Sequence, residues 1–193
     1  IRALRRAVED GLDVQGVATS YASRDLAREV GIPLVGLDGI ERIDVAIDGA
    51  DQVDDDLALI KGGGAAHARE KVVDSTAARF VVVADPSKVT PELDRPVAVE
   101  VLPDARATVR RAIRDCGGTP TLRTAERKDG PVVTDNGNLV LDCEFGAITE
   151  PASLATDLAS IPGVVEHGLF VGLADEVHVG REDGVTVRGA DGE

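Results

Sequence analysis

The chain has 193 residues, a formal net charge of −14 at neutral pH, 43% hydrophobic residues and only 2% aromatic residues. This length and apolar content are enough for a folded core built from Val, Leu, Ile and Ala, and they argue against long disordered stretches. The acidic balance argues against nucleic acid as a partner, and no apolar run approaches the roughly 18 residues of a membrane helix, so we expect a cytoplasmic protein that does not bind membranes.

In the first half of the chain, helical and extended patterns alternate, which indicates a parallel sheet with covered faces. A helix is predicted over residues 1–8, and no capping residue stands in front of it, so we expect a strand and a turn to precede it. A second helix is predicted from Ser23, which can cap it, to Val30. The other predicted elements are strands over residues 14–20, 32–36, 43–47 and 79–84, and a helix over residues 64–77.

The pattern changes near Pro96 to the order strand, helix, strand, strand, helix, strand, which is typical of ferredoxin-like domains. The predicted strands cover residues 97–102, 121–124, 139–145 and 164–170, the helices cover 105–116 and 151–161, and a hairpin turn is expected at 135–138. We therefore predict an α/β protein. A Rossmann-like parallel-sheet domain covers residues 1–96 and 174–193, and a smaller ferredoxin-like α+β domain covers residues 97–173. Two short strands in the tail, 176–179 and 185–187, are expected to return to the first sheet.

Several polar residues follow the predicted parallel strands, where ligands bind in open α/β sheets. Asp48 and Asp51 come just after the strand that ends at Ile47, and Lys88 comes just after the strand that ends at Ala84. The segment between these strands contains a lysine, three glycines and a glutamate. These residues are Lys61, Gly62, Gly63, Gly64 and Glu70. We expect all of them to meet at one edge of the sheet.

The glycines and the glutamate each suit a particular task. Three residues without side chains at the start of a helix let backbone N–H groups face an anion or sugar oxygens. The pattern differs from a P-loop, because Lys61 precedes the glycines. Glu70 lies about two helical turns beyond Gly63, on nearly the same side. A carboxyl group that loses solvent in such a turn gains a raised pKa and suits general-base catalysis.

Other polar residues have simpler interpretations. Asp54–Asp56 are expected to form a turn, and a calcium site is not expected because the EF-hand spacing is absent. His67 is an alternative base, although a surface position on the helix is favoured. Cys116 and Cys143 lack the spacing of metal ligands, and both are expected to be small buried hydrophobic residues.

Glu70 stands between Arg69 and Lys71, so in isolation it is equally well interpreted as one member of a solvated helix face. The wider set of motifs changes this interpretation. These motifs are Asp48-Gly-Ala-Asp51, Lys61-Gly-Gly-Gly64 followed by Arg69-Glu-Lys71, Asp85-x-Ser-Lys88, Val132-Val-Thr-Asp-Asn-Gly-Asn138, Ile161-Pro-Gly-Val-Val165 and Gly168-Leu-Phe170. In this order and over nearly the whole chain, they resemble the type A ribose-5-phosphate isomerase family.

The resemblance implies an enzyme that interconverts D-ribose 5-phosphate and D-ribulose 5-phosphate in the non-oxidative pentose phosphate pathway, without metal or cofactor. It implies that Glu70 carries a proton between C2 and C1 through an enediol. Lys61 would stabilise the negative oxygen of this enediol, and Asp48 and Asp51 would hold sugar hydroxyls and assist ring opening. The implied substrate-binding residues are Thr19, Ser20, Asp48, Gly49, Ala50, Asp51, Lys61, Gly62, Gly63, Gly64 and Lys88.

The sequence departs from the family at its start, because it lacks the Gly-Thr-Gly-Ser-Thr type phosphate loop between the first strand and the first helix. We therefore predict that a longer version is an active isomerase and that this chain alone is weak or inactive. The family also suggests a homodimer or a homotetramer, with the ferredoxin-like part as the interface.

Two other functions, a sugar-phosphate sensor and an acyl-CoA transferase, are alternatives to an isomerase. A sugar-phosphate sensor domain of a transcription regulator resembles this fold but needs no proton shuttle, and an acyl-CoA transferase of related architecture would use a glutamate as nucleophile. The net charge of −14 repels an anionic substrate. Because the screening length falls to about 3 Å near 1 M salt, a salt-rich cytoplasm is our hypothesis for this acidic chain.

Overall fold

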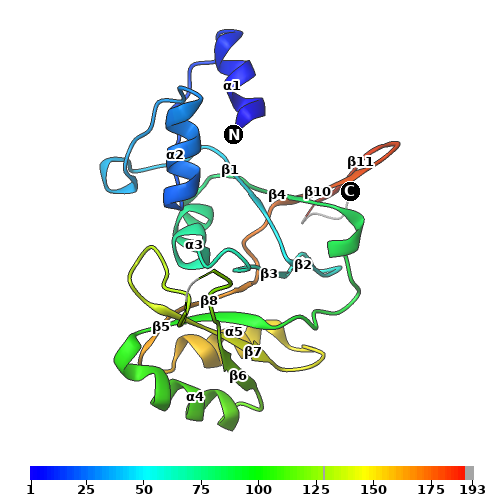
Figure 1. Cartoon of the computed structure of the whole chain (residues 1–193). Helices are drawn as coiled ribbons and strands as arrows, with labels where there is room; N and C mark the ends of the chain where they lie inside the picture. The colour runs from blue at the N-terminus through cyan, green and yellow to red at the C-terminus, as the bar shows by residue number, and fades with distance from the viewer. Residues whose placement is uncertain (128, 190–193) are drawn as a thin grey trace.

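Figure 1 shows the computed structural model, which describes residues 1–127 and 129–189. The helices are α1 (Arg2–Glu9), α2 (Tyr21–Glu29), α3 (His67–Thr76), α4 (Arg106–Asp115) and α5 (Pro151–Ala159), with short 3-10 turns η1 (Leu37–Gly39), η2 (Pro86–Lys88) and η3 (Pro103–Ala105). The strands are β1 (Ala46–Gly49), β2 (Gln52–Val53), β3 (Leu59–Ile60), β4 (Phe80–Ala84), β5 (Val97–Val101), β6 (Thr119–Leu122), β7 (Leu139–Glu144), β8 (Val164–His167), β9 (Leu169–Phe170), β10 (Glu176–Arg181) and β11 (Gly184–Gly189).

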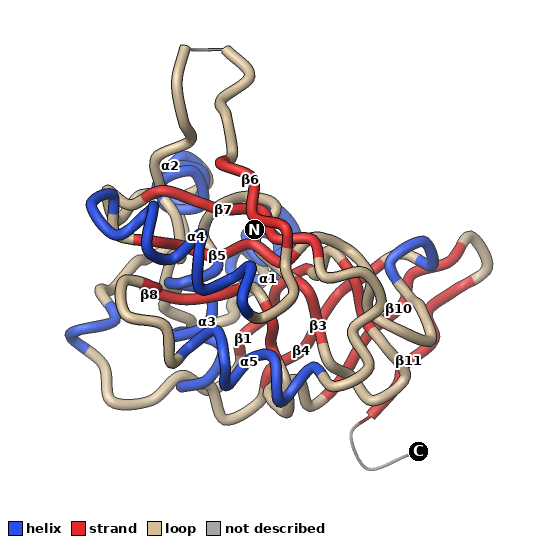
Figure 2. Tube along the Cα trace, turned by 90° about the horizontal axis from the view of Figure 1, so that it is seen from below, coloured by secondary structure: helices blue, strands red, loops and turns tan. Residues whose placement is uncertain are grey.

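The first sheet has the strand order β1-β4-β10-β11, in which β1, β4 and β10 are parallel and β11 is antiparallel to β10. The tail therefore returns to this sheet as predicted, and β10 and β11 extend as a hairpin away from the rest of the chain (Figures 1 and 2). Phe80 and Val82 in β4 and Val177 in β10 are almost fully buried on one face of this sheet. Their apolar side chains hold the strands whose ends carry the polar residues.

The second large sheet has the order β6-β7-β5-β8, with all neighbouring strands antiparallel. Helices α4 and α5 pack through Val109, Ile113 and Leu158 into the core formed by this sheet (Figure 1). This order and the β-α-β-β-α-β sequence are those of the ferredoxin-like arrangement, so the predicted fold class is confirmed. The exact domain boundaries stay a prediction, and residues 190–193 lie outside the described residues.

A third, small sheet with the order β2-β3-β9 was not predicted. The strand predicted over residues 164–170 is in fact divided at Gly168, with β8 in the second sheet and β9 in the third. A Cβ atom at Gly168 would lie 2.1 Å from the carbonyl oxygen of Lys61, so only glycine allows this close approach. The small sheet thereby connects Lys61 to the end of β8.

The strands predicted over residues 14–20 and 32–36 are wrong in extent, because they meet only through an isolated parallel bridge between Gly16 and Leu34. Gly16 N–H donates to the carbonyl of Pro33, and Val35 N–H donates back to Gly16. Pro33 has no N–H group and interrupts the ladder.

Three element boundaries also differ from the prediction. The strand predicted over residues 43–47 is β1 (Ala46–Gly49), because its register is set by pairing Ala46 with Phe80, so Asp48 lies within the strand end rather than after it. The cap of α2 is Ser20 rather than Ser23, and the two serines form a capping box. Helix α3 begins at His67, three residues after the last glycine of the turn.

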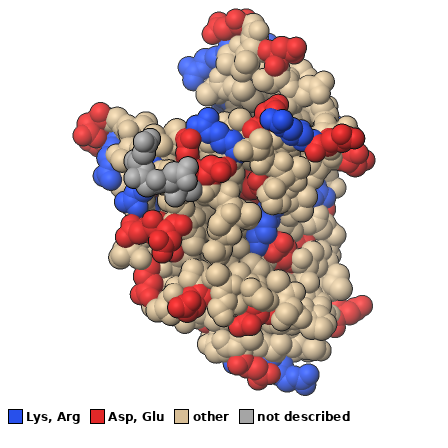
Figure 3. Space-filling model, turned by 180° about the vertical axis from the view of Figure 1, so that it is seen from behind, with Lys and Arg blue, Asp and Glu red and all other residues tan. Residues whose placement is uncertain are grey.

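The acidic side chains that give the chain its net charge of −14 do not gather in one patch on the face seen in Figure 3. Acidic side chains are spread over the face seen in Figure 3, with Lys and Arg between them. Cys143 is buried as predicted, whereas the prediction for Cys116 is wrong, because it lies at the exposed C-terminus of α4. Within the described residues, the helices are too short or too polar to cross a membrane.

Candidate active site

A buried lysine stands at the centre of the predicted site. The Nζ atom of Lys61 lies 2.7 Å from Oδ2 of Asp48 and 3.3 Å from Oε2 of Glu70, and it donates to the carbonyl oxygen of Gly49 at 2.5 Å. The lysine side chain is only 3% exposed, whereas those of Asp48 and Glu70 are 28% and 17% exposed. The ammonium group is therefore fixed, and the two carboxylates remain accessible from the solvent side.

Three elements bring these side chains together. Asp48 lies in β1, Lys61 follows directly after β3, and Glu70 lies in the first turn of α3. The backbone N–H of Lys61 donates to the carbonyl oxygen of Gly168 at 2.8 Å, which anchors the residue to the segment between β8 and β9. The convergence predicted for Asp48, Lys61 and Glu70 is thus observed in the structure.

The glycine turn is held from two sides. Oδ2 of Asp51 accepts from the backbone N–H of Gly63 at 2.8 Å, and a Cβ atom at Gly63 would lie 2.9 Å from this carboxylate. Gly62 has a φ of 107°, which favours glycine. From the ferredoxin-like sheet, Nη1 of Arg123 donates to the carbonyl oxygens of Gly62 and Gly63 at 2.7 and 3.1 Å.

These residues enclose a small open cavity with a volume of about 180 Å³. Its lining consists of Asp48, Gly49, Ala50, Asp51, Lys61, Gly62, Gly63, Gly64 and Glu70. All of these were named from the sequence. The cavity presents three carboxylates, one ammonium group and a bare backbone to a ligand, which suits a small hydroxylated molecule.

The pKa values of the central pair are shifted in the same direction for different reasons. Burial raises the pKa of Glu70, and the attraction of Lys61 only partly opposes this effect. Burial alone would lower the pKa of Lys61, but the charges of Asp48 and Glu70 outweigh it, so the net shift is upward. Lys61 therefore stays an ammonium ion, and Glu70 is a stronger base than an exposed glutamate.

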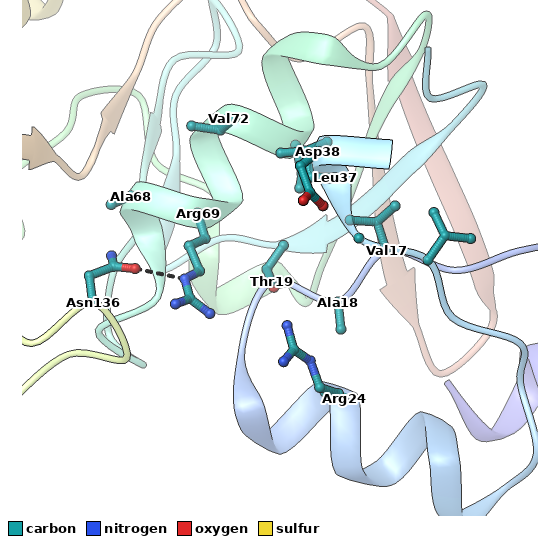
Figure 4. Close-up of a pocket in the computed structure, with 13 residues that line it drawn as sticks. Val17, Ala18, Thr19, Arg24, Leu37, Asp38, Ala68, Arg69, Val72 and Asn136 are labelled. Carbon is teal, nitrogen blue, oxygen red and sulfur yellow. Dashed lines mark hydrogen bonds between the residues drawn. The ribbon is translucent and has the colours of Figure 1, made fainter. Parts of the chain in front are cut away.

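The other predicted substrate-binding residues lie apart from this cavity. Thr19 lines a separate, larger cavity of about 450 Å³ together with Arg24 and Arg69 (Figure 4). The hydroxyl of Ser20 accepts from the backbone N–H of Ser23 and is engaged in the cap of α2. Lys88 is half-buried in η2 and is not among the residues that line the small cavity. Binding by Thr19, Ser20 and Lys88 therefore stays a prediction.

The expectation that His67 lies on the surface is wrong. Its side chain is fully buried, and its Nδ1 atom lies 3.0 Å from the position that a Cβ atom of Gly62 would occupy. Burial lowers the pKa of His67 to about 4, so the imidazole is neutral at physiological pH. His67 packs behind the glycine turn, and it does not line the cavity.

Sequence reasoning assigned no role in this site to three residues that shape it. Asp74 is buried near Asp48, Lys61 and Glu70, and its spacing of four residues from Glu70 on a helix was a usable signal. Gly168 interrupts a strand pattern, which is also a recognisable signal. Arg123 gave no local signal, because its contact with the glycine turn joins residues about sixty positions apart.

The described residues contain no group of three or more His, Cys, Asp or Glu side chains arranged to hold a metal ion. The cation at this site is the ammonium group of Lys61.

The fold and the charged cluster together define an α/β enzyme with an acid–base site at the edge of a parallel sheet. Residues 15–184 match the family model of ribose 5-phosphate isomerase A (phosphoriboisomerase A), and the chain belongs to this family. It is 67% identical to the ribose-5-phosphate isomerase A of Haloarcula marismortui over 188 residues, which cover 97% of this chain and 82% of that relative.

Solved structures agree with this assignment. The ribose 5-phosphate isomerase A of Methanocaldococcus jannaschii matches with a TM-score of 0.93 and 43% identity, over 97% of this chain and 84% of the other. A D-ribose-5-phosphate isomerase in complex with phospho-erythronic acid matches with a TM-score of 0.94 and 41% identity, over the same shares of the two chains.

Proposed function

We infer that this protein is an aldose–ketose isomerase that interconverts D-ribose 5-phosphate and D-ribulose 5-phosphate through an enediol intermediate. The single observation that carries this conclusion is the buried Lys61 ammonium, which contacts both Asp48 and Glu70 beside a bare glycine turn. The solved relative in complex with phospho-erythronic acid, an acid that carries a phosphate group, supports a sugar phosphate as the ligand.

We propose Glu70 as the base that moves the proton. Its carboxylate takes the proton from C2 of the open-chain aldose, and the electrons of the C–H bond form the C1–C2 double bond as the electrons of the C1=O bond move onto O1. The proton is then returned to C1, while the hydroxyl on C2 gives up its proton, O1 ends as a hydroxyl, and C2 becomes the ketone carbon. A raised pKa favours this exchange, because a base and its conjugate acid both need to be accessible near neutral pH.

Lys61 is proposed to stabilise the negative charge that develops on the substrate oxygen during proton removal. A fixed ammonium group that is itself buried acts strongly on such a charge, and the Lys61 side chain is only 3% exposed. Its three contacts with Asp48, Glu70 and the carbonyl of Gly49 hold Nζ in place before the substrate arrives, so little reorganisation is needed.

Asp48 and Asp51 are proposed to bind the sugar hydroxyls and to assist opening of the ring. Asp51 uses one oxygen to accept from Gly63 N–H, which leaves its other oxygen for a hydroxyl group. Lys88 is proposed to approach the phosphate or a sugar oxygen, since it follows the neighbouring parallel strand β4.

The test is the formation of ribulose 5-phosphate from ribose 5-phosphate without coenzyme A, in this chain and in the longer version predicted to be active, each with Glu70 and with Glu70→Gln. Loss of a general base typically costs about 10²–10⁴-fold in rate, and we expect a loss in kcat of this size. Glu29→Gln, which changes an exposed glutamate on α2, serves as the control. Full activity in Glu70→Gln would exclude the proposed base, and activity that requires coenzyme A would favour a transferase.

The cellular context is also a proposal. We place the enzyme in the non-oxidative pentose phosphate pathway, in the cytoplasm and in a homodimer or a homotetramer. A relative from the halophile Haloarcula marismortui and the net charge of −14 support activity at high salt. Activity measured from low to molar KCl, with the oligomeric state measured by light scattering at each salt concentration, tests both points.

A further inference from the structure

Asp74 is a buried carboxyl group, and one of its oxygens has no hydrogen-bond partner among the described residues. It lies on α3 one turn beyond Glu70, and its side chain is only 3% exposed. Its Oδ2 atom is fully buried and has no hydrogen-bond partner in the part of the chain that the structure describes. A buried carboxylate oxygen without a donor is costly, whereas the neutral acid is tolerated far better.

The charges around Asp74 also disfavour its ionised form. The groups that act on it are Asp48 from β1, Lys61 from the end of β3 and Glu70 from its own helix. Lys61 is the one cation among them, and it already contacts the other two carboxylates. A charged Asp74 would therefore be the third carboxylate that shares a single ammonium group.

The position of Asp74 in the helix adds to this effect. Glu70 lies in the first turn of α3, where the positive end of the helix dipole favours a negative charge, whereas Asp74 lies in the last turn, which ends at Thr76 and contains no basic residue. The two acidic side chains of the helix thus have opposite preferences. Burial, followed by the charge of Asp48, raises the pKa of Asp74 to about 7, and Lys61 opposes this shift.

We propose that Asp74 is a positioning residue that remains protonated so that Lys61 is shared by two carboxylates and not three, and that its ionisation sets the alkaline limit of isomerisation. This inference rests on the proposed function. Once ionised, Asp74 draws Lys61 away from the substrate oxygen and adds a negative charge near the enediolate, which is itself negative. Both effects raise the barrier without any contact between Asp74 and the substrate.

The first test is the pH profile of kcat/KM between pH 6 and 9 at constant salt, in the wild type and in Asp74→Asn. We expect the wild-type value to fall about tenfold above pH 7, the factor that corresponds to one pKa unit of interaction. Asp74→Asn, which cannot ionise, should lose less than about twofold over the same range. Asp25→Asn, which removes a charge from the exposed face of α2, should keep the wild-type profile. An alkaline fall of the same size in Asp74→Asn would overturn the proposal.

The second test measures thermal stability and does not depend on the reaction. A carboxyl group whose folded pKa lies near 7 and whose unfolded pKa lies near 3.8 makes the wild type lose stability as the pH rises from about 4 to 7. Asp74→Asn does not take part in this loss, so its Tm should exceed that of the wild type at pH 8 and approach it at pH 4. A difference in Tm that is independent of pH, or a failure of Asp74→Asn to fold, would overturn the proposal.

The two tests separate this inference from the proposed function. If neither this chain nor the longer version predicted to be active isomerises ribose 5-phosphate, the proposed function and the alkaline limit are both refuted, whereas the pH-dependent gap in Tm still reports the proton on Asp74. If isomerisation is observed and the gap in Tm is absent, the proposed function stands and the protonated Asp74 does not.

Discussion

Two glutamates in the two large parts of the molecule have contrasting surroundings. Glu100 on β5 is fully buried, and its Oε1 atom accepts from Thr134, Asn136 and Asn138 at 2.8–3.0 Å. Glu70 on α3 faces a single cation, Lys61, and an open cavity. Three neutral donors on one oxygen of a fully buried side chain give Glu100 a structural role, whereas one cation and an open side leave Glu70 able to exchange a proton. The other oxygen of Glu100, Oε2, is buried and has no hydrogen-bond partner within the described residues.

The turn at residues 134–138 connects the surroundings of Glu100 with those of Glu70. Asn136 donates through Nδ2 to Glu100 and accepts through Oδ1 from Nε of Arg69 at 2.7 Å (Figure 4). Arg69 immediately precedes Glu70 in the first turn of α3. The carboxylate that orders the turn therefore also helps to fix the helix that carries the proposed base.

After Glu70→Gln, the largest expected effect comes from removing the cation beside Glu70. Lys61→Gln keeps much of the side-chain volume but removes the charge that is proposed to stabilise the enediolate. Loss of a group of this kind typically costs about 10²–10³-fold in kcat, and we expect a loss of this size with a smaller change in KM. Steady-state kinetics with ribose 5-phosphate provide the measurement, with the exposed Arg28→Gln on α2 as the charge-matched control. A loss below tenfold would mean that Lys61 mainly binds the substrate or stabilises the fold.

An intermediate effect, on stability and not on rate, is expected at Glu100. Glu100→Gln keeps the shape but replaces hydrogen bonds to a charged acceptor by weaker ones, and a buried amide N–H₂ then takes the place of an oxygen. We expect a loss of about 1–3 kcal/mol in the free energy of unfolding, measured by urea denaturation, with kcat within about twofold of the wild type. Unchanged stability together with a large loss of kcat would show that the two glutamates are not as different as their partners indicate.

The sequence predicted which charged residues converge better than it predicted where individual strands begin and end. Asp48, Lys61 and Glu70 could be brought together because the ends of parallel strands meet at one edge, and this depends only on the order of the elements. The strand predicted over residues 14–20 was wrong in extent because a strand also needs a partner with free N–H groups, and Pro33 interrupts the partner segment.

Contacts between distant segments could not be predicted. The three neutral donors of Glu100 come from a turn more than thirty residues away, and a hairpin signal in that turn does not indicate which buried charge it surrounds. His67 was misplaced for the same reason, since helical spacing alone does not reveal that the glycine turn covers this face of α3. Burial of polar groups is therefore the property that the local pattern predicts least well.

The smallest expected effect tests how strongly the ferredoxin-like sheet supports the glycine turn. Arg123→Gln removes the donors to the carbonyl oxygens of Gly62 and Gly63, and loss of a hydrogen bond of about 0.5–1.5 kcal/mol corresponds to a rise in KM of about twofold to tenfold. We expect kcat to change little, because Lys61 and Glu70 remain in place.

The matched variant for this test is Asp142→Asn. It weakens the ion pair in which Nε of Arg123 lies 2.9 Å from Oδ2 of Asp142, but it leaves Nη1 on the two glycine carbonyls. If the glycine contacts matter, the KM of Arg123→Gln rises and that of Asp142→Asn stays near the wild-type value. Equal increases in both variants would instead assign the effect to the ion pair within the second sheet, and the glycine turn would then be held mainly by Asp51 from its own side of the site.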